Sequence, residues 1–363
     1  MTIVLVAGAR PNFMKIAPLI HELNKLEFCD YILVHTGQHY DFQMSRVFFE
    51  EFKIPEPDYF LNVGPGSHAV QTAKIMIEFE RVCLSELPEI IVVVGDVNST
   101  LACALVAKKL NLRAAHIEAG LRSGDMAMPE EINRIVTDSI SDYLFVSEKS
   151  GVTNLKREGK GDAQIFFVGN IMIDTLFHQL DNLKRAGVNV SSTTEKEKYG
   201  VVTLHRPSNV DNKEVCTDIV NCLIEISEDM ELIFPVHPRT KKNLDDFGLT
   251  EIILKNSDIH LKPPLSYSEF LGFWKDAAVV FTDSGGLQEE TTALGIPCFT
   301  LRDNTERPIT TEIGTNIIVG NKKDSIMAAY ADFKAGRLKT GSVPELWDGK
   351  TAQRIAKILI DKL

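Results

Sequence analysis

Residues 277–294 read AAVVFTDSGGLQEETTAL, an apolar run that leads into a glycine pair and then into a longer patterned segment. The run at 277–281 has the composition of a buried β-strand. After it, Leu287, Thr291 and Leu294 recur at the spacing of one face of a helix. Because a strand that leads directly into a helix is the repeating unit of a parallel sheet, this stretch predicts an α/β fold.

Comparable units recur along the whole chain. Short runs rich in β-branched residues alternate with helical patterns, and they form two series of similar size. The first series lies at residues 3–7, 31–35, 90–94, 114–117, 143–146 and 165–168, and the second at 201–204, 232–236, 259–261, 279–281, 298–301 and 316–319.

Two doubly wound, Rossmann-like α/β domains that face a cleft are the expected architecture, since 363 residues are too many for one ordinary core. The first domain is expected to span residues 1–169, joined by a C-terminal helix at 350–363. The second is expected to span residues 170–349, with a surface loop at 188–198.

The composition is that of an ordinary globular protein, with 44% hydrophobic and 25% charged residues. Its net charge of −11 argues against binding to nucleic acid or to an anionic membrane surface. No apolar run has transmembrane length, and the apolar N-terminus has the pattern of a strand and not of a signal peptide. Six scattered cysteines without a C-x-x-C pair favour reduced thiols, so we expect a cytoplasmic protein.

Basic residues follow the first predicted strand. Arg10 and Lys15 come after a single glycine, and the G-x-G-x-x-G pattern of dinucleotide sites is absent from this turn. We therefore expect no nicotinamide or flavin cofactor. Both residues would suit a solvated surface, but their place at a strand-to-helix turn favours contact with a phosphate group.

Three carboxylates follow strands or begin helices of the first half. Asp96 comes directly after the strand at 90–94, where helix capping and catalysis are equally consistent with its position. Glu118 ends a run whose interior should be buried, which favours a functional role. Glu130 follows Pro129 at a predicted helix start, where the helix dipole alone would explain an acidic residue. Together the three would suit proton transfer to and from carbon.

His205 and His237 each follow a strand of the second half, and side chains at neighbouring strand ends are well placed to contact a ligand. Neither belongs to an H-x-x-x-H or H-E-x-x-H pattern, so we expect no metal.

The glycine-containing turn at 282–290 has two predicted functions. Ser284 and the amides of Gly285 and Gly286 lie at a helix N-terminus, where they can bind a phosphate. At about 100° per residue, Glu290 lies beside the apolar stripe and points inward, where a ribose diol could donate to it. Glu289 lies nearly opposite that stripe and is expected to be solvated.

Nine motifs in this order resemble the non-hydrolysing UDP-N-acetylglucosamine 2-epimerases, and the resemblance covers the chain from the first strand to the C-terminal helix. They are GARPNFMK (8–15), HTGQHYDFQMS (35–45), GDVNSTLA (95–102), HIEAGLRSGD (116–125), MPEEINR (128–134), LHRPSNVD (204–211), PVHPRT (235–240), TDSGGLQEE (282–290) and LRDNTERP (301–308).

This resemblance implies a GT-B arrangement of the two domains, a homodimer, and interconversion of UDP-GlcNAc and UDP-ManNAc for surface polysaccharide synthesis. Carried over by position, it implies catalytic roles for Asp96, Glu118, Glu130 and His205. It implies UDP-sugar binding by Arg10, Lys15, Arg134, Ser284, Gly285, Gly286, Glu290 and Arg307. The sequence departs from many bacterial members after His205, where Arg206-Pro207-Ser208 replaces Arg-Arg-Glu of a regulatory site, which leaves activation by substrate open.

Inversion at C2 without a dinucleotide favours anti elimination of UDP to a glycal, followed by re-addition with a proton on the opposite face. Which carboxylate is the acid and which the base stays open at this point. The alternatives are a 2-epimerase of a more decorated UDP-sugar, a GT-B glycosyltransferase, and a nucleotide-sugar sensor without turnover.

Overall fold

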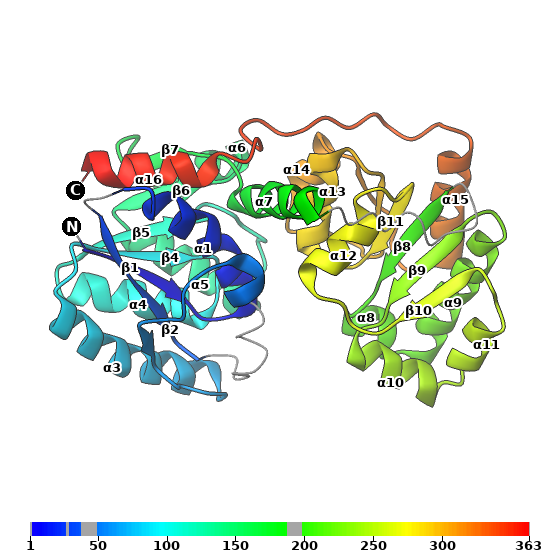
Figure 1. The fold of residues 1–363 in the computed structure, drawn as a ribbon, viewed down its shortest axis with the longest axis horizontal. Coiled ribbons are helices and arrows are strands. Elements are labelled where there is room, and N and C mark those ends of the chain that lie inside the picture. Colours follow the sequence, from blue (N-terminus) through cyan, green and yellow to red (C-terminus); the bar gives the residue numbers. More distant parts are fainter. Residues whose placement is uncertain (1, 27–28, 38–48, 187–197, 363) are drawn as a thin grey trace. The chain divides into compact units, whose positions relative to one another are not determined.

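The structure, a computed structural model, describes residues 2–26, 29–37, 49–186 and 198–362, and it leaves the side chain of Arg10 undescribed. The chain divides into two compact units, Met1–His178 with Glu345–Leu363, and Gln179–Pro344. Each unit is treated by itself (Figure 1). The loop expected at 188–198 lies, except for Lys198, outside the described residues. Among the described residues, no helix combines the length and the apolar character needed to cross a bilayer.

The first unit contains, within its described residues, a seven-stranded sheet in which every neighbouring pair is parallel. Its strand order is β3 (Tyr59–Phe60), β2 (Asp30–His35), β1 (Thr2–Ala7), β4 (Ile90–Val94), β5 (Arg113–Ile117), β6 (Tyr143–Val146) and β7 (Ile165–Phe167). Its helices are α1 (Arg10–Leu23), α3 (His68–Glu86), α4 (Asn98–Lys109), α5 (Pro129–Ile140), α6 (Lys149–Arg157) and α16 (Thr351–Lys362), and α7 (Ile171–Ala186) runs on into the second unit.

The second unit contains, in its described part, a six-stranded sheet that is also parallel throughout. Its strand order is β10 (Ile259–Lys262), β9 (Glu231–Pro235), β8 (Tyr199–Thr203), β11 (Val279–Thr282), β12 (Cys298–Thr300) and β13 (Asn316–Ile318). Its helices are α8 (Pro207–Val210), α9 (Lys213–Ser227), α10 (Pro238–Asp246), α11 (Thr250–Leu254), α12 (Tyr267–Trp274), α13 (Gly285–Leu294), α14 (Pro308–Glu312) and α15 (Lys323–Lys334).

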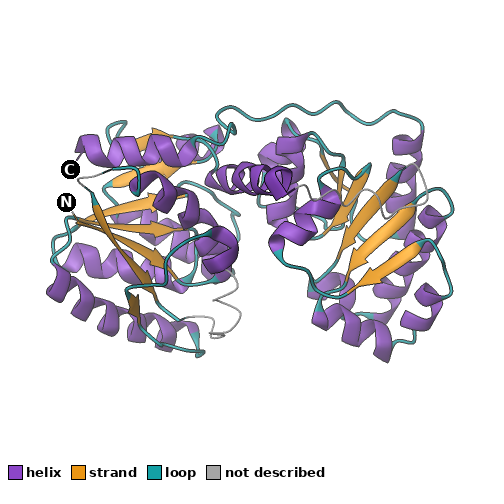
Figure 2. Cartoon of the chain, in the orientation of Figure 1, coloured by secondary structure: helices purple, strands orange, loops and turns teal. Residues whose placement is uncertain are grey.

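The predicted fold class is confirmed, because every segment predicted as a strand is a strand and helices cover both faces of each sheet (Figure 2). The edge strand β3 was not predicted. Its two residues follow Pro55 and Pro57 and offer no alternating pattern.

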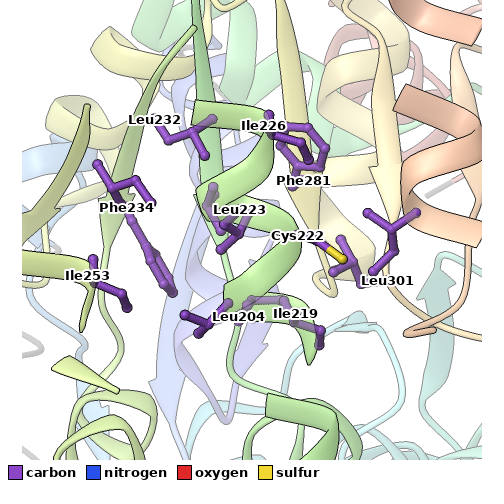
Figure 3. Close-up of a cluster of buried hydrophobic side chains, with 14 of the residues drawn as sticks. Leu204, Ile219, Cys222, Leu223, Ile226, Leu232, Phe234, Ile253, Phe281 and Leu301 are labelled. Atoms are coloured by element: carbon purple, nitrogen blue, oxygen red, sulfur yellow. The ribbon is translucent and has the colours of Figure 1, made fainter. Parts of the chain in front are cut away.

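Burial of apolar helix faces against the sheets explains why these segments fold as they do. In the second unit, α9 turns Ile219, Cys222, Leu223 and Ile226 toward the sheet, and all four are buried. Their spacing of three or four residues places them on one side of the helix, as Figure 3 shows. The strands are buried on both faces, which accounts for their nearly continuous apolar sequences.

Strand order reverses between β1 and β4 in the first unit and between β8 and β11 in the second. Loops leave on opposite faces of the sheet at such a reversal, and they open a crevice beyond the carboxyl ends of the strands. These two sheet edges are therefore where the functional residues of each unit should gather.

The C-terminal segment is anchored to the first unit. Trp347 is buried and its Nε1 donates to the carbonyl oxygen of Ser147 at 3.2 Å. Asp174 accepts the first backbone N–H groups of α16, those of Thr351 at 3.1 Å and Ala352 at 2.7 Å. The helix then packs against α1.

A substitution at Gly169 tests how much this anchoring contributes to the stability of the protein. Its φ is 92°, and a Cβ at this position would lie 2.1 Å from the carbonyl oxygen of Leu346. Gly169→Ala should lower the free energy of unfolding by more than about 2 kcal/mol, because it adds this clash to a strained backbone. Gly161→Ala is the control, since a Cβ there meets nothing within 4 Å. Equal urea midpoints for the two variants would contradict this explanation.

Candidate functional site

The turn after β1 is held against the end of β4 by one buried amide. The Oδ1 of Asn12 accepts the backbone N–H groups of Gly8 at 3.2 Å and Ala9 at 2.9 Å, while its Nδ2 donates to the carbonyl oxygen of Val94 at 3.1 Å. These three hydrogen bonds fix the start of α1 relative to β4. This places Lys15, one turn into α1, beside the residues that follow β4.

Lys15 pairs with Glu118 at this edge. The Nζ of Lys15 donates to Oε2 of Glu118, and the side chains are only 12% and 5% exposed. Glu118 has a φ of 71°, which a residue with a side chain adopts at a cost and which is common at functional sites. The pair lies against Gly95, where a Cβ would be 3.4 Å from Nζ and 3.6 Å from Oε2. The predicted burial of Glu118 is therefore confirmed.

Asp96 is held by Arg134 at the start of α4. The N-cap residue of α4 is Val97, which supplies no side-chain hydrogen bond. Instead, Nη2 of Arg134 donates to Oδ2 of Asp96 at 2.5 Å, and Nη1 donates to Glu131 at 2.9 Å. Arg134 was expected to contact the UDP-sugar, and here its guanidinium orients Asp96, whose side chain stays 28% exposed.

Glu131 is a buried residue that the sequence prediction missed. Its two carboxylate oxygens accept the backbone N–H groups of Ser123 and Gly124, both at 2.9 Å. Burial by itself would raise the pKa of Glu131, but these N–H groups and Arg134 outweigh it and hold the pKa below its usual value. The spacing of three residues between Glu131 and Arg134 was the available signal for this pair.

Glu130 has different surroundings from its neighbour Glu131. It is the second residue of α5, after Pro129, and it is half-buried. Within the described part of the chain, no hydrogen bond or ion pair involves its side chain. The first turn of α5 adjoins Asp96, because Nδ2 of Asn133 donates to the carbonyl oxygen of Asp96 at 2.8 Å. The first unit thus gathers Asp96, Glu118 and Glu130 at one sheet edge, two of them paired with cations.

In the second unit, a fully buried carboxylate sets the position of His205. Asp283, which follows β11, accepts the backbone N–H groups of His205 at 3.0 Å and Arg206 at 2.9 Å, and the Nδ2 of Asn209 at 3.1 Å. Its Oδ1 also lies 2.7 Å from Nδ1 of His205. Burial would raise the pKa of Asp283, but these donors lower it below the usual value. With Nδ1 committed to Asp283, Nε2 of a ring that is 40% exposed is left for a ligand.

His237 lies beside His205, with 6.1 Å between the ring centroids. Its Nδ1 accepts the backbone N–H of Arg239 at 3.2 Å and so caps α10. Burial and then the nearby His205 lower the pKa of His237. The neutral ring therefore carries its hydrogen on Nε2, as a donor.

The N-terminus of α13 lies at the strand reversal of the second unit. Ser284 is its N-cap residue, and its side chain does not cap the helix. A Cβ at Gly286 would meet nothing within 4 Å, and one at Gly285 would meet only Oε2 of Glu306, at 3.9 Å. The space at both Cβ positions is therefore open, and binding of an anion by Ser284 and the two glycines stays a prediction.

The expectation that Glu289 is solvated was wrong. Glu289 is 3% exposed, and its Oε1 lies 2.9 Å from Nε of Arg307. The helical wheel gave the correct inward direction for Glu290, but it could not show that the segment before α14 covers the opposite face of α13. Arg307, expected to bind the UDP-sugar, thus supports α13 from that side.

Glu290 is buried and accepts a hydrogen bond from the hydroxyl of Tyr267 at 2.6 Å. Burial raises the pKa of Glu290 to about 8, and the hydrogen bond from Tyr267 lowers this pKa only in part. Tyr267 was not among the predicted site residues, because it lies on a helix 23 residues away in sequence. The side chain of Arg10 and most of the motif at 35–45 lie outside the described residues.

Comparison with known proteins gives consistent similarities over the whole chain. The model of the UDP-N-acetylglucosamine 2-epimerase family matches residues 21–360. The UDP-N-acetylglucosamine 2-epimerase of Methanocaldococcus jannaschii is 45% identical over 99% of both chains. The UDP-2,3-diacetamido-2,3-dideoxy-D-glucuronate 2-epimerase of Pseudomonas aeruginosa is 38% identical over 99% of both chains.

Among solved structures, the chain is similar to the crystal structure of the M. jannaschii UDP-GlcNAc 2-epimerase in complex with UDP-GlcNAc and UDP. The TM-score is 0.83 with 45% sequence identity, and the alignment covers 99% of this chain and 100% of that chain.

The raised pKa of Glu290 predicts a pH dependence of stability. Because the pKa of about 8 in the folded protein exceeds the ordinary value of 4.5, the contribution of this group is full below pH 4.5 and is lost as pH rises through 8. The free energy of unfolding should therefore fall relative to that of Glu290→Gln between about pH 5 and 9. Glu251→Gln, at an exposed position of the same unit, is the control. A constant difference between wild type and Glu290→Gln would contradict the prediction.

Proposed function

Because the chain belongs to the UDP-N-acetylglucosamine 2-epimerase family, we propose that it interconverts UDP-GlcNAc and UDP-ManNAc. The observation that carries this proposal is the group of three carboxylates at the β1/β4 edge. Two of them are paired with cations, and Glu130 has no such pair within the described ranges of the chain. Such a group can move protons at a carbon atom, and the turn after β1 lacks the glycine pattern of a dinucleotide site.

The proposed reaction is an elimination followed by an addition. A carboxylate removes the proton from C2 of the sugar, the electrons of that bond form a C1–C2 double bond, and the C1–O bond breaks with its electron pair leaving on UDP. UDP then adds back to C1 while a carboxylic acid delivers a proton to the opposite face of C2. The overall change is inversion at C2, with no net loss of electrons or protons.

Proton transfer is assigned to Asp96, Glu118 and Glu130. Among the described residues, no hydrogen bond or ion pair engages the side chain of Glu130, so its carboxyl group is available to contact the sugar. Glu118 and Asp96 each lie beside a cation, Lys15 and Arg134 respectively. Both stay candidates for proton transfer, and both can stabilise developing positive charge on the sugar ring.

UDP binding is assigned to the second unit. The open N-terminus of α13 at Ser284, Gly285 and Gly286 suits the diphosphate, and Glu290 suits the two hydroxyls of the ribose. Nε2 of His205 is available to the departing diphosphate, because Asp283 holds Nδ1. The other proposed contacts of the UDP-sugar are Arg10, Lys15, Arg134, His237 and Arg307.

We further propose that the protein works in the cytoplasm, where it supplies precursors of surface polysaccharide. All six cysteines are buried and free of disulfides, as expected in a reducing compartment. A second candidate substrate is the diacetamido sugar named for the Pseudomonas relative, favoured by the 38% identity to that protein.

Incubation with UDP-GlcNAc alone in D2O tests the reaction. NMR should show deuterium at C2 together with UDP-ManNAc. Asp96→Asn should lower the rate of exchange by at least about a hundredfold, since it removes a charged group at the reacting centre, and should leave UDP affinity nearly unchanged.

The other outcomes are distinct. Unchanged UDP-GlcNAc would favour a glycosyltransferase or a sensor, and turnover of the diacetamido sugar alone would favour the second substrate. Exchange that persists in a purified Asp96→Asn variant would contradict the role of Asp96.

A homodimer is proposed on the basis of an apolar stripe along α3. Val70, Ile77 and Leu84 repeat every seven residues and are 48%, 54% and 58% exposed, and Leu87 at the helix end is 74% exposed. Exposed apolar residues in one line on a 19-residue helix are typical of a helix-pairing surface.

Charge along the same helix favours a second copy of the chain as the partner. The N-terminal half carries Lys74, whereas the C-terminal half carries Glu78, Glu80, Arg81 and Glu86 and is acidic overall. Two copies related by a two-fold axis would pair these helices antiparallel, which brings each basic half against an acidic half.

Ile77→Asp should therefore convert the dimer into monomers, because it places a charge at the centre of the paired surface. The measurement is light scattering coupled to size-exclusion chromatography. Ile252→Asp, at an apolar position that is 47% exposed on α11 in the other unit, is the matched control and should stay dimeric. Monomeric wild-type protein, or a dimeric Ile77→Asp variant, would overturn the proposed surface.

A further inference from the structure

A buried network behind the three carboxylates has no part in the reaction proposed above. His116 lies within β5 and Asp138 within α5, and both side chains are fully buried. Nδ1 of His116 lies 2.7 Å from Oδ1 of Asp138, and Nε2 lies 2.8 Å from the carbonyl oxygen of Gly95. Neither residue can reach a substrate, so any influence on the chemistry passes through other residues.

Both ring nitrogens of His116 face oxygen atoms that can accept a hydrogen bond, one from an aspartate side chain and one from a peptide carbonyl. Asp138 has a second charged neighbour: Nη2 of Arg122 lies 2.7 Å from Oδ2 of Asp138 and also 2.7 Å from Glu158.

Asp138 also binds the turn that contains Glu118. The backbone N–H of Gly120 donates to Oδ2 of Asp138 at 3.0 Å. Gly120 has a φ of 80°, and a Cβ there would lie 2.4 Å from the carbonyl oxygen of Gly151. This turn, which includes the unfavourable backbone of Glu118, is thus held from behind by Asp138 and by close packing.

The three segments that carry the carboxylates share this network. The Gly95 carbonyl belongs to the peptide bond that leads into Asp96, so His116 fixes that peptide from behind while Arg134 fixes the side chain in front. Glu118 follows His116 by two residues on the same chain segment. Asp138 lies on α5, two turns after Glu130.

We propose that His116 and Asp138 are positioning residues, which set the relative placement of Asp96, Glu118 and Glu130 for proton transfer at C2. The proposal rests on the epimerase function proposed above. A shift of about 1 Å in a reacting group can lower a rate by as much as about a hundredfold, so loosening this network should act on kcat. Binding of UDP, assigned to the second unit, should not change.

The test uses two variants that each keep one of the two hydrogen bonds. His116→Asn places an amide nitrogen near the position of Nδ1, so it keeps Asp138 and loses the Gly95 carbonyl. His116→Gln reaches the position of Nε2 and keeps the Gly95 carbonyl. Since that bond fixes Asp96, His116→Asn should lower kcat by about tenfold or more with KM within about twofold, and His116→Gln should restore a large part of it.

His260→Asn is the matched control, because Nε2 of His260 lies 2.8 Å from Glu231 in the second unit, away from any assigned residue. Its kcat and KM should equal those of the wild type. If His116→Asn does not fold, Arg122→Gln serves in its place, since it loosens Asp138 without altering β5, and it should also lower kcat at constant KM.

The possible failures are distinguishable. If the wild-type protein does not epimerise UDP-GlcNAc, the proposed function itself is contradicted. If the wild type is active, folded variants with unchanged kcat would overturn the positioning role. Equal losses in the Asn and Gln variants, in proportion to their folded fraction, would mean that His116 only supports the core.

Discussion

A charge that is moved out of water must find a partner, and this constraint determines the arrangement of both sheet edges. At the β1/β4 edge, Glu118 is almost fully buried and Lys15 satisfies it. At the β8/β11 edge, Asp283 is fully buried and takes three N–H donors as well as the ring of His205. Without these partners, either carboxylate would take up a proton or would turn toward solvent, and the residues held against it would lose their positions.

The ion pairs at the β1/β4 edge also explain why some acidic residues there remain available to a substrate. Arg134 engages Glu131 and Asp96 together, so that one buried cation serves a buried and a partly exposed carboxylate. Glu130, next to Glu131 in sequence, projects from the same helix start without such a partner in the described part of the chain. Adjacent residues of the same type thus have different surroundings: Glu131 holds the backbone at 123–124, and Glu130 is the one proposed to exchange protons.

The sequence was sufficient for the fold class because parallel strands buried on both faces must be apolar along their whole length, as in Ile90–Val94. It was also sufficient to place Asp96, Glu118 and His205 at strand ends. It could not show pairs between distant segments. Arg134 lies 38 residues from Asp96, and Arg307 comes from beyond β12 to cover Glu289. For the same reason, the pattern left the capping role of Asp96 open and gave Glu289 the wrong environment.

The departure and return of UDP can be followed with UDP-GlcNAc that carries 18O in the bridge between C1 and the β-phosphorus. If the C1–O bond breaks, rotation of the free β-phosphate exchanges the label between bridging and non-bridging positions. 31P NMR of the recovered UDP-GlcNAc and UDP-ManNAc should show this exchange. Complete conversion to the equilibrium mixture with all the 18O still in the bridge would contradict it.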